Sequence, residues 1–553
     1  MKLSRIAIFA TITIICIAAF TRLFMLSSLP ISPYWEEVAL GYDAYSLLKT
    51  GKDHHGNSWP ILAVESFGDW KPSGYFYATM PTIAIFDLTV LAVRLPSAIA
   101  GILIVLGVGL LAHALKGNFL LALFLATISP WAIQFSRGAW EVNLATACLL
   151  WGIVFLIYSF NTVRSSKTFK VLSVLLIVYS AYTYHAARVV APLLWGVVWL
   201  PYIFSGKEIT KRIISFIPYA LGVTVLILPI ILSVRDPKIS QRFQETSIFS
   251  DTSIVAESNA RREYAGNSLA SNFFYNRRVL YSREIMSNML KHFDPQFLFI
   301  SGDENPRHST GLFGIFYSFE IVFLTVGFMY VLFRGTLYQR FLLVWVFIAL
   351  IPIALTKDTP HALRFLLAMP ALMIIIQIGI QQILEKISSK KFVGGMISYK
   401  QIGFLALGFL YIFSFSMFWR HYSTVYKIKS ASEWQYGYEQ LMKVVSQYKS
   451  ENQNASIAIS RQLGRPAMYY WFYTATNPKS VQALNSYVTK DQGEYLQFEG
   501  ISFFDSLSEL DSVRPSMIAV TAIENHSISQ EYTLQESIES PDGKVIWYIF
   551  SLK

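Results

Sequence analysis

The stretch PISPYWEEVALGYDAYSLLKTGKDHHGNSWPILAVESFGDWKPSGYFYATMPTIAIF (residues 30–86) separates two long apolar runs and decides how often the chain crosses a membrane. Its last part, Ser73–Phe86, is apolar, but it has only about 14 residues and an internal proline, whereas a spanning helix needs about 20 apolar residues. If it were a span, every later connection rich in Lys and Arg would face the outside of the cell, against the positive-inside rule. We therefore expect Ser73–Phe86 to form an interfacial or membrane-dipping helix within the first outer connection.

The composition of the 553 residues indicates a protein that crosses the membrane many times. Hydrophobic residues make up 54% of the chain and charged residues only 15%, whereas about a quarter of a soluble protein is charged. The first apolar run, Ile6–Phe24, lacks a clear small-x-small cleavage site, so we expect an uncleaved anchor rather than a signal peptide. Both cysteines, Cys16 and Cys148, lie inside apolar runs, so no disulfide framework is implied.

The formal charge of +11 reflects membrane topology and does not indicate a nucleic-acid partner, since Lys and Arg cluster in short connections. Under the positive-inside rule the following connections face the cytoplasm: His113–Lys116, Arg164–Lys170, Lys207–Arg212, Arg334–Arg340 and Lys386–Lys400. The alternate connections then face outward: Pro30–Asp87, Arg137–Asn143, Tyr184–Arg188, Arg235–Thr310 and Thr356–Arg364. This predicts an all-α bundle of about eleven transmembrane helices in a plasma or inner membrane, with the N-terminus inside and the C-terminal tail outside.

The composition changes after Phe418, which divides the chain into a transmembrane domain (residues 1–420) and an extracytoplasmic α/β domain (residues 421–553). Helical periodicity predicts a helix over Ser432–Tyr448. Alternating runs predict strands at Ser456–Ser460, Met517–Val520 and Val545–Phe550. The first outer connection (residues 30–87) and the connection 235–310 are the large loops of the transmembrane domain.

Ionisable side chains gather at the predicted outer ends of the spans. Such residues are costly in lipid, and loops on one side of a rigid bundle commonly carry function. The candidates are Glu36, Glu37, Asp43, Asp69 and Lys71, then Arg137 and Glu141, then Tyr182, His185 and Arg188, and finally Lys357, Asp358, His361 and Arg364. A permease would more often place its polar groups near the middle of the membrane, at broken helices.

Glu36 and Glu37 open a predicted helix that ends before Gly51. Acidic residues at a helix N-terminus are stabilised by the macrodipole, which is a purely structural explanation. Alternatively, one of them is a general base for an acceptor hydroxyl. Adjacent residues project about 100° apart on a helix, so the two glutamates cannot share one role. The sequence leaves open which of them takes the proton.

Lys71 and Arg188 offer positive charge on the same predicted face of the membrane. Each is explained either as an interfacial anchor or as a ligand for a phosphate group. Arg137 and Glu141 lie four positions apart and can pair across one helical turn. Tyr182 and His185 are candidates for the lining of a pocket. The chain has no Walker A loop, HExxH, paired CxxC or G-x-S-x-G motif, which argues against an ATPase, a zinc protease or a serine hydrolase.

Several of these motifs, taken together, resemble the integral-membrane C-type glycosyltransferases of the protein O-mannosyltransferase and aminoarabinose (lipid A) transferase type. The matching stretches are WEEVALGYDAYSLLKTG (35–51), SFGDWKP (66–72), VRLPSAIAG (93–101), SPWAIQFSRGAWE (129–141), AYTYHAARVVAPLL (181–194), HFDPQFLFISGDENPRH (292–308) and TKDTPHALRFLLAMPAL (356–372). The stretch 292–308 adds Asp303 and His308 to the pocket candidates. His185 lies in the stretch 181–194, and His361 and Arg364 lie in the stretch 356–372. The resemblance covers residues 1 to about 420 and leaves the tail uncovered.

The resemblance implies a sugar donor on polyprenyl phosphate, transfer on the outer face, and a polyprenyl-phosphate leaving group. It places Glu36 at the family's catalytic aspartate, Glu37 at the glutamate that follows it, and Lys71 at a basic residue near the lipid phosphate. Some relatives have a glutamate immediately before that lysine, where this chain has Trp70, so a metal ligand at that position is unsupported. A lipid monophosphate also leaves with less charge to neutralise than a diphosphate. We therefore expect a reaction without a metal or other cofactor.

The sugar, a hexose or a pentose, is not encoded in any motif, and neither is the acceptor, which is a hydroxyl or phosphate on a glycolipid, a protein or a polymer. Two other functions remain open from the sequence: a transporter or flippase of lipid-linked sugars, and a polysaccharide polymerase or ligase. The structured first connection with its paired carboxylates favours the enzyme.

Overall fold

A computed structural model describes residues 4–161, 165–205, 208–236, 241, 244–387, 398–484, 490–491, 494–510, 513–525 and 528–553. Arg164 and Lys207, and parts of the predicted connections 235–310 and 386–400, lie outside the described residues. The chain forms two compact units. The first contains residues 1–24, 99–136 and 140–419, and the second contains residues 25–98, 137–139 and 420–553. The first outer connection therefore groups with the C-terminal tail.

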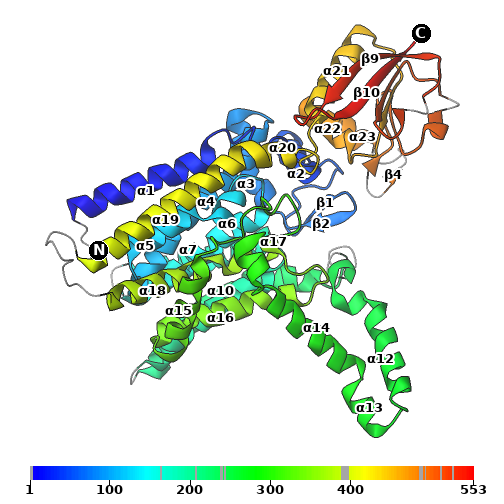
Figure 1. Ribbon diagram of the computed structural model, residues 1–553. Coiled ribbons are helices and arrows are strands. Elements are labelled where there is room, and N and C mark those ends of the chain that lie inside the picture. Colours follow the sequence, from blue (N-terminus) through cyan, green and yellow to red (C-terminus); the bar gives the residue numbers. More distant parts are fainter. Residues whose placement is uncertain are drawn as a thin grey trace. The chain divides into compact units, whose positions relative to one another are not determined.

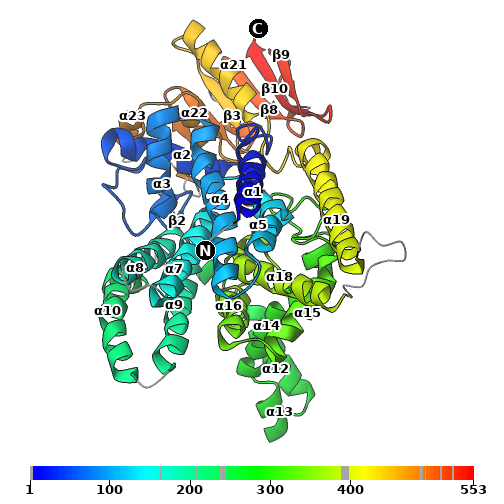
Figure 2. The same ribbon diagram turned by 90° about the vertical axis from the view of Figure 1, so that its left-hand side faces the viewer.

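The first unit is a bundle of apolar helices (Figures 1 and 2). Its long helices are α1 (Arg5–Leu23), α7 (Glu141–Asn161), α8 (Ser166–Thr183), α9 (Ala187–Phe204), α10 (Ile209–Ser233), α16 (Leu337–Ala354), α18 (Met369–Lys386) and α19 (Tyr399–His421). Shorter helices are α5 (Phe119–Ile128), α6 (Pro130–Gln134) and α15 (Glu320–Phe333). α4 (Val90–Ala114) begins in the second unit and continues in the first. α8 packs against α7, α9 and α10, as Figure 2 shows.

Among the described residues, eight helices are long and apolar enough to cross a membrane. α5 and α15 are apolar but shorter, and α8 carries Lys167 and Lys170 in its first turns. Each apolar segment that the sequence predicts as a span contains one of these eight helices or one of α5, α8 and α15. The fold class predicted from the sequence, a multi-pass helical membrane protein, is confirmed.

The connection between α10 and α15 is helical rather than extended. It contains η1 (Ile248–Ser250), α12 (Thr252–Tyr264), α13 (Leu269–Phe274), α14 (Arg277–Lys291) and the π-helical turn η2 (Gln296–Ile300). Asp251 and Asn276 cap α12 and α14 by accepting hydrogen bonds from backbone amides of the first turn. α17 (Ala362–Phe365) and η3 (Leu366–Ala368) lead from the next outer connection into α18.

The second unit combines the first connection with the tail. The connection forms α2 (Trp35–Thr50), a hairpin of β1 (Val64–Ser66) and β2 (Asp69–Lys71), and α3 (Gly74–Phe86). α3 is the short helix predicted over Ser73–Phe86; its position relative to a membrane stays a prediction. The tail continues from α19 through η4 (Tyr422–Tyr426) and α20 (Lys427–Lys429) into a domain with α21 (Tyr438–Glu451), α22 (Pro466–Tyr473), α23 (Pro478–Leu484) and η5 (Leu507–Leu510).

A six-stranded sheet in the order β6-β7-β3-β8-β10-β9 forms the centre of the tail domain (Figure 1). Its strands are β3 (Ile457–Ser460), β6 (Gln497–Phe498), β7 (Ile501–Phe504), β8 (Met517–Thr521), β9 (Tyr532–Glu539) and β10 (Val545–Leu552), and β4 (Lys490–Asp491) pairs separately with β5 (Glu494–Tyr495). β7, β3 and β8 are parallel, whereas β10 and β9 extend the sheet antiparallel. The three predicted strands are present, and every residue of β3 and β8 is buried, as expected for central strands.

The predicted helix over Ser432–Tyr448 is wrong at its start. The helix begins at Tyr438, because Gln435 and Gly437 before it have φ of +52° and +104°, which a helix does not accommodate. The backbone turns there so that the Gln435 side chain reaches the first residue of α2. Helical periodicity carries no information about that contact.

Two glycines let α15 and α18 approach until their backbones touch. A Cβ on Gly327 would overlap the carbonyl oxygen of Ile375, and a Cβ on Gly379 would overlap that of Phe323. Small residues at such crossings are typical of helix pairs in membranes. Gly196 in α9, by contrast, has no atom within 4 Å of the position of a Cβ.

We expect Gly327→Ala to destabilise the protein by about 1–3 kcal/mol, because the added methyl group forces the two helices apart. The measurement is the melting temperature of the detergent-purified protein, with Gly196→Ala as the matched control. Gly196→Ala should leave the melting temperature unchanged or raise it, since alanine favours a helix over glycine. Equal melting temperatures for the two variants would contradict the close packing of α15 against α18.

Candidate active site

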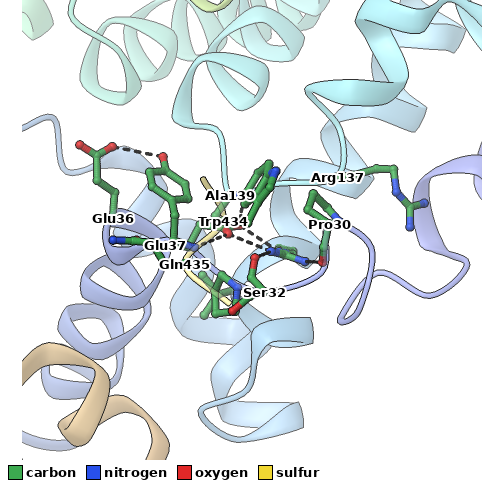
Figure 3. A network of polar contacts seen from close by, with 12 residues as sticks. Pro30, Ser32, Glu36, Glu37, Arg137, Ala139, Trp434 and Gln435 are labelled. Carbon is green, nitrogen blue, oxygen red and sulfur yellow. Dashed lines mark hydrogen bonds and ion pairs between the residues drawn. The ribbon is translucent and has the colours of Figure 1, made fainter. Parts of the chain in front are cut away.

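The N-terminus of α2 presents Glu36 and Glu37 in the first turn, as the sequence predicts. Tyr34 is the N-cap, and its backbone N–H donates to Oε2 of Glu37 at 3.3 Å. The helix ends at Gly51, whose φ of +71° gives a left-handed C-cap. The two carboxylates therefore sit on the same turn, but they project in different directions (Figure 3).

Glu37 is buried and saturated with hydrogen bonds; its exposed fraction is 1%. Its Oε1 accepts from Nε of Arg94 at 2.9 Å and from the backbone N–H of Ala139 at 2.7 Å, and its Oε2 accepts from Nη2 of Arg94 at 2.9 Å. With the Tyr34 N–H, the carboxylate accepts four hydrogen bonds. Because a carboxylate has about four lone-pair sites, Glu37 has none left for the proton of an acceptor.

Arg94, on α4, is completely buried and uses every donor of its guanidinium group. Besides its two bonds to Glu37, Nη1 donates to the carbonyls of Leu26 and Pro30 at 3.0 and 2.9 Å, and Nη2 donates to that of Ser32 at 2.7 Å. Figure 3 shows the network around this ion pair. Sequence reasoning missed Arg94, although an arginine inside the apolar run VRLPSAIAG is itself a signal of an intramembrane or interfacial polar site.

Glu36 has a different environment, because its side chain keeps 35% of its surface exposed. Its Oε2 lies 3.1 Å from Nζ of Lys71 and accepts a hydrogen bond from the Tyr34 hydroxyl at 3.1 Å. Glu36 is therefore an accessible carboxylate paired with an ammonium group.

Lys71 reaches Glu36 from the end of the β1–β2 hairpin, and its side chain is only 5% exposed. Phe67 and Gly68 form the turn with φ of +55° and +76°, so both central residues are left-handed. Asp69 is at that turn, where its Oδ1 accepts from the Trp70 N–H at 2.8 Å. The turn sets the register in which Lys71 pairs with Val64, and this fixes the lysine beside α2.

The tail domain supplies the support for the start of α2. Oε1 of Gln435 accepts from the N–H of Trp35 at 2.8 Å and from the hydroxyl of Tyr469 at 2.9 Å. The same hydroxyl oxygen lies 2.9 Å from the Pro33 carbonyl oxygen, a second acceptor for its one proton. Trp434 stacks edge-on against Tyr34 and lies 5.6 Å from the Arg94 guanidinium. None of these tail residues was a sequence candidate, because the partners are about 400 positions apart in the chain.

Two further candidates in the same unit are buried away from solvent. Arg137 donates to the carbonyl of Leu29 at 3.0 Å and lies over the ring of Tyr422, and burial lowers its pKa. Asp43 lies about two turns along α2 from Glu36 and accepts from the ring of His54 at 2.6 Å. Both hold the unit together rather than lining an open site.

The remaining candidates belong to the first unit, the helical one. The Tyr182 hydroxyl donates to the carbonyl of Leu226 at 2.9 Å. Glu141 opens α7, His185 lies between α8 and α9, and Arg188 is in the first turn of α9. The N–H of Lys357 donates to the carbonyl of Thr246, and Arg364 donates to the hydroxyl of Thr356 at 2.8 Å.

Asp303, His308 and His361 form a cluster in the helical unit. Nδ1 of His308 and of His361 lie 3.3 and 3.7 Å from Oδ2 of Asp303. Burial alone would raise the pKa of Asp303, but the nearby imidazoles of His308 and His361 hold it at about 2. Burial, Arg364 and His308 lower the pKa of His361 well below its ordinary value. At neutral pH the cluster therefore holds a carboxylate and a neutral imidazole of His361.

No protein-family model and no curated protein matches the sequence. Among solved structures, the chain is similar to ArnT from Cupriavidus metallidurans in the apo state, with a TM-score of 0.53 and 12% identity over 98% of this chain and 97% of ArnT. The same ArnT bound to undecaprenyl phosphate gives a TM-score of 0.53, 11% identity and the same coverage. An Archaeoglobus fulgidus oligosaccharyltransferase in complex with Zn and sulfate gives 0.52 and 11%, over 97% of this chain and 72% of that chain. The fold is thus similar to that of ArnT and of this oligosaccharyltransferase, in agreement with the fold that the resemblance in the motifs implies.

We expect Glu37→Gln to destabilise the protein by about 3–5 kcal/mol, because it leaves the buried Arg94 guanidinium without its counter-charge. Glu36→Gln is the matched control on the same helical turn. It removes one ion pair whose lysine is buried but whose carboxylate is partly exposed, and the glutamine amide oxygen still accepts from Lys71, so the loss of stability should be clearly smaller than for Glu37→Gln. Melting temperatures that fall equally in the two variants would contradict this division of roles.

The Asp43–His54 pair makes stability depend on pH. Burial alone would lower the pKa of His54, but the charge and the hydrogen bond of Asp43 raise it above the ordinary value of 6.5. Because the pKa is raised in the folded state, the stabilisation is fully present below pH 6.5 and is lost as the pH rises through the folded-state pKa.

The measurement is the melting temperature of wild type and His54→Gln between about pH 5.5 and 9, in steps of about one pH unit. We expect the advantage of wild type to be largest at the acidic end and to shrink above pH 6.5. The exposed His113→Gln serves as the control and should follow wild type at every pH. An advantage that stays constant with pH would show that His54 is not charged in the folded protein.

Proposed function

We propose that the protein is a membrane glycosyltransferase that transfers a sugar from a polyprenyl-phosphate donor to an acceptor on the outer face of the membrane. The observation that carries the proposal is the accessible Glu36 carboxylate beside the Lys71 ammonium group, 3.1 Å apart. The fold supports it, since one of the similar structures, ArnT, is bound to undecaprenyl phosphate. In this proposal the basic connections between the spans face the cytoplasm, so that the first connection and the tail lie outside.

Glu36 is the general base in this mechanism. Its carboxylate accepts the proton of the acceptor hydroxyl, and the acceptor oxygen forms a bond to the anomeric carbon of the donor sugar. The bond between that carbon and the phosphate oxygen breaks, and polyprenyl phosphate leaves with the electron pair. Glu37 cannot replace Glu36, because all of its lone-pair sites accept hydrogen bonds from protein donors.

Lys71 binds the phosphate and stabilises the charge that develops on it as the sugar leaves. Before the donor binds, Glu36 neutralises the buried Lys71. A donor phosphate that pairs with Lys71 competes with Glu36 for the ammonium group, which frees the carboxylate for the acceptor. Donor binding therefore prepares the base. In this proposal a side chain supplies the positive charge at a monophosphate, and no step uses a metal ion.

Glu37 and Arg94 are positioning residues. Their ion pair holds the segment 26–32 and the first turn of α2 in one arrangement. It thereby directs Glu36 toward Lys71, and it contributes no atom to the reaction.

The transfer reaction tests the role of Glu36. Purified protein is assayed with a panel of polyprenyl-phosphate pentoses and hexoses and a membrane glycolipid extract as acceptor. Glu36→Gln should lower the rate of transfer by about 10²–10⁴-fold, the usual contribution of a general base. Full transfer by a folded Glu36→Gln protein, with its normal melting temperature, would contradict the assignment. Vectorial movement of the donor lipid across vesicles without transfer would support a flippase instead.

Lys71 is tested by the binding of undecaprenyl phosphate itself, measured by calorimetry in detergent. Lys71→Ala should weaken binding about 10–100-fold, because hydrogen bonds to charged groups contribute about 1.5–3 kcal/mol. Lys71→Arg should recover part of that loss, and Lys52→Ala, an exposed lysine of the same connection, should bind like wild type. Unchanged binding by Lys71→Ala would make Lys71 a structural residue only.

A further inference from the structure

Three side chains with metal-ligating atoms meet in the helical unit from two separate connections. Asp303 and His308 follow η2 at the end of the large connection, and His361 precedes α17. One ligand atom from each of the three lies within 4.8 Å of the others. Two imidazoles and one carboxylate are a donor set that suits Zn²⁺ and neighbouring transition metals, whereas Mg²⁺ and Ca²⁺ prefer oxygen ligands alone.

The two histidines are buried with nitrogen atoms that lack hydrogen bonds. Nδ1 of His308 and Nδ1 of His361 are both inaccessible to solvent and make no hydrogen bond. His308 as a whole is only 8% exposed. A buried polar atom without a partner is destabilising. Here two such atoms face the same oxygen of Asp303, so one cation bound between them would satisfy both.

The distances agree with such an ion. Zn–N and Zn–O bonds of about 2.0–2.2 Å place neighbouring ligand atoms of a tetrahedral site roughly 3.4 Å apart. The two Nδ1 atoms are 3.3 and 3.7 Å from Oδ2 of Asp303.

Surrounding groups hold each ligand in place. Oδ2 of Asp303 accepts from the N–H of Ala362 at 2.7 Å, and Oδ1 accepts from that of Asn305 at 2.9 Å. The rings of Trp140 and Phe135 pack on His308 with centroids 5.4 and 5.8 Å away. Such outer contacts orient ligands and are a regular part of metal sites.

A third histidine, His292, supports His361 and is itself unavailable as a ligand. His292 forms a 2.7 Å hydrogen bond between its Nδ1 and the Asn288 carbonyl, and its Nε2 accepts from the N–H of His361 at 3.2 Å. Both ring nitrogens are therefore engaged, with Nδ1 as the donor. The cluster thus offers three protein ligands and leaves a fourth position.

We propose that Asp303, His308 and His361 bind a divalent transition-metal ion of the Zn²⁺ class, with the fourth position open to water. The ion would tie the end of the connection after α14 to the residue that precedes α17. This site shares no residue with Glu36, Lys71 or the Glu37–Arg94 pair. The transfer reaction proposed above has no step through it, so each proposal stands or falls by its own experiment.

The test is the uptake of Zn²⁺ by the full-length protein, purified with a tag that contains no histidine. The protein is stripped with a chelator, equilibrated with Zn²⁺ and analysed for bound metal and for melting temperature. We expect one Zn²⁺ per chain and a rise in melting temperature on binding. His308→Gln, His361→Gln and Asp303→Asn should each weaken binding by at least ~100-fold, and His113→Gln should bind like wild type.

The absorption spectrum of the Co²⁺-loaded wild type is a second measurement, and it does not depend on whether the variants fold. Wild-type protein loaded with Co²⁺ should show the visible absorption of a four-coordinate site, and Zn²⁺ should displace that absorption. No stoichiometric Zn²⁺ in the stripped and reloaded wild type would overturn the proposal. So would binding that is unchanged in folded His308→Gln and His361→Gln proteins.

Discussion

The buried ion pair between Glu37 and Arg94 is the interaction on which the second unit depends. Removing two charges from water is expensive, and the cost is recovered only if every donor and acceptor finds a partner. Here the five N–H groups of Arg94 and the lone pairs of Glu37 are all engaged. The acceptors include carbonyls of the segment that leads into α2, so the charge pair organises the backbone around it.

This arrangement explains how two adjacent glutamates acquire different chemistry. Since α2 is anchored by Glu37 on its buried side, Glu36 is carried to the accessible side of the same turn. Trp434 and Gln435 of the tail add a second constraint, because they pack on Tyr34 and bind the first amide of the helix. The tail domain, whose part in the reaction was unknown from sequence, is therefore a structural component of the proposed active site.

Lys71 approaches from an independent element, the β1–β2 hairpin. Its nearly complete burial matters, because an ammonium group in such a place needs a negative partner at all times. Glu36 is that negative partner in the free protein. In the proposed reaction the donor phosphate, which is also negative, takes over this role. The two ends of the first connection are thus linked through one ion pair.

Local patterns predicted much of this fold. Helix signals placed α2 between Glu36 and Gly51, and the short apolar stretch ahead of Asp87 forms the predicted helix α3. The central strands of the tail were visible as apolar runs, and the charge pattern located the connections between the helices. These features depend on neighbours in the sequence, which is why a single sequence reveals them.

Contacts between distant residues could not be predicted in the same way. The role of Arg94 depends on carbonyls more than 60 positions away, and the turn at Gln435 depends on Trp35, 400 positions earlier. The sequence therefore identified both glutamates as candidates but could not assign their roles. The roles proposed for them rest on burial and hydrogen-bond saturation, which only the three-dimensional arrangement provides.

Chemical rescue distinguishes the two proposed roles, Glu36 as the base that takes the proton and Glu37 as the residue that positions Glu36. Glu36→Ala and Glu37→Ala are compared in the transfer assay with increasing concentrations of sodium formate. We expect formate to restore transfer to Glu36→Ala, since a small carboxylate can enter the accessible position, and to leave Glu37→Ala inactive. Rescue of Glu37→Ala together with no rescue of Glu36→Ala would contradict it.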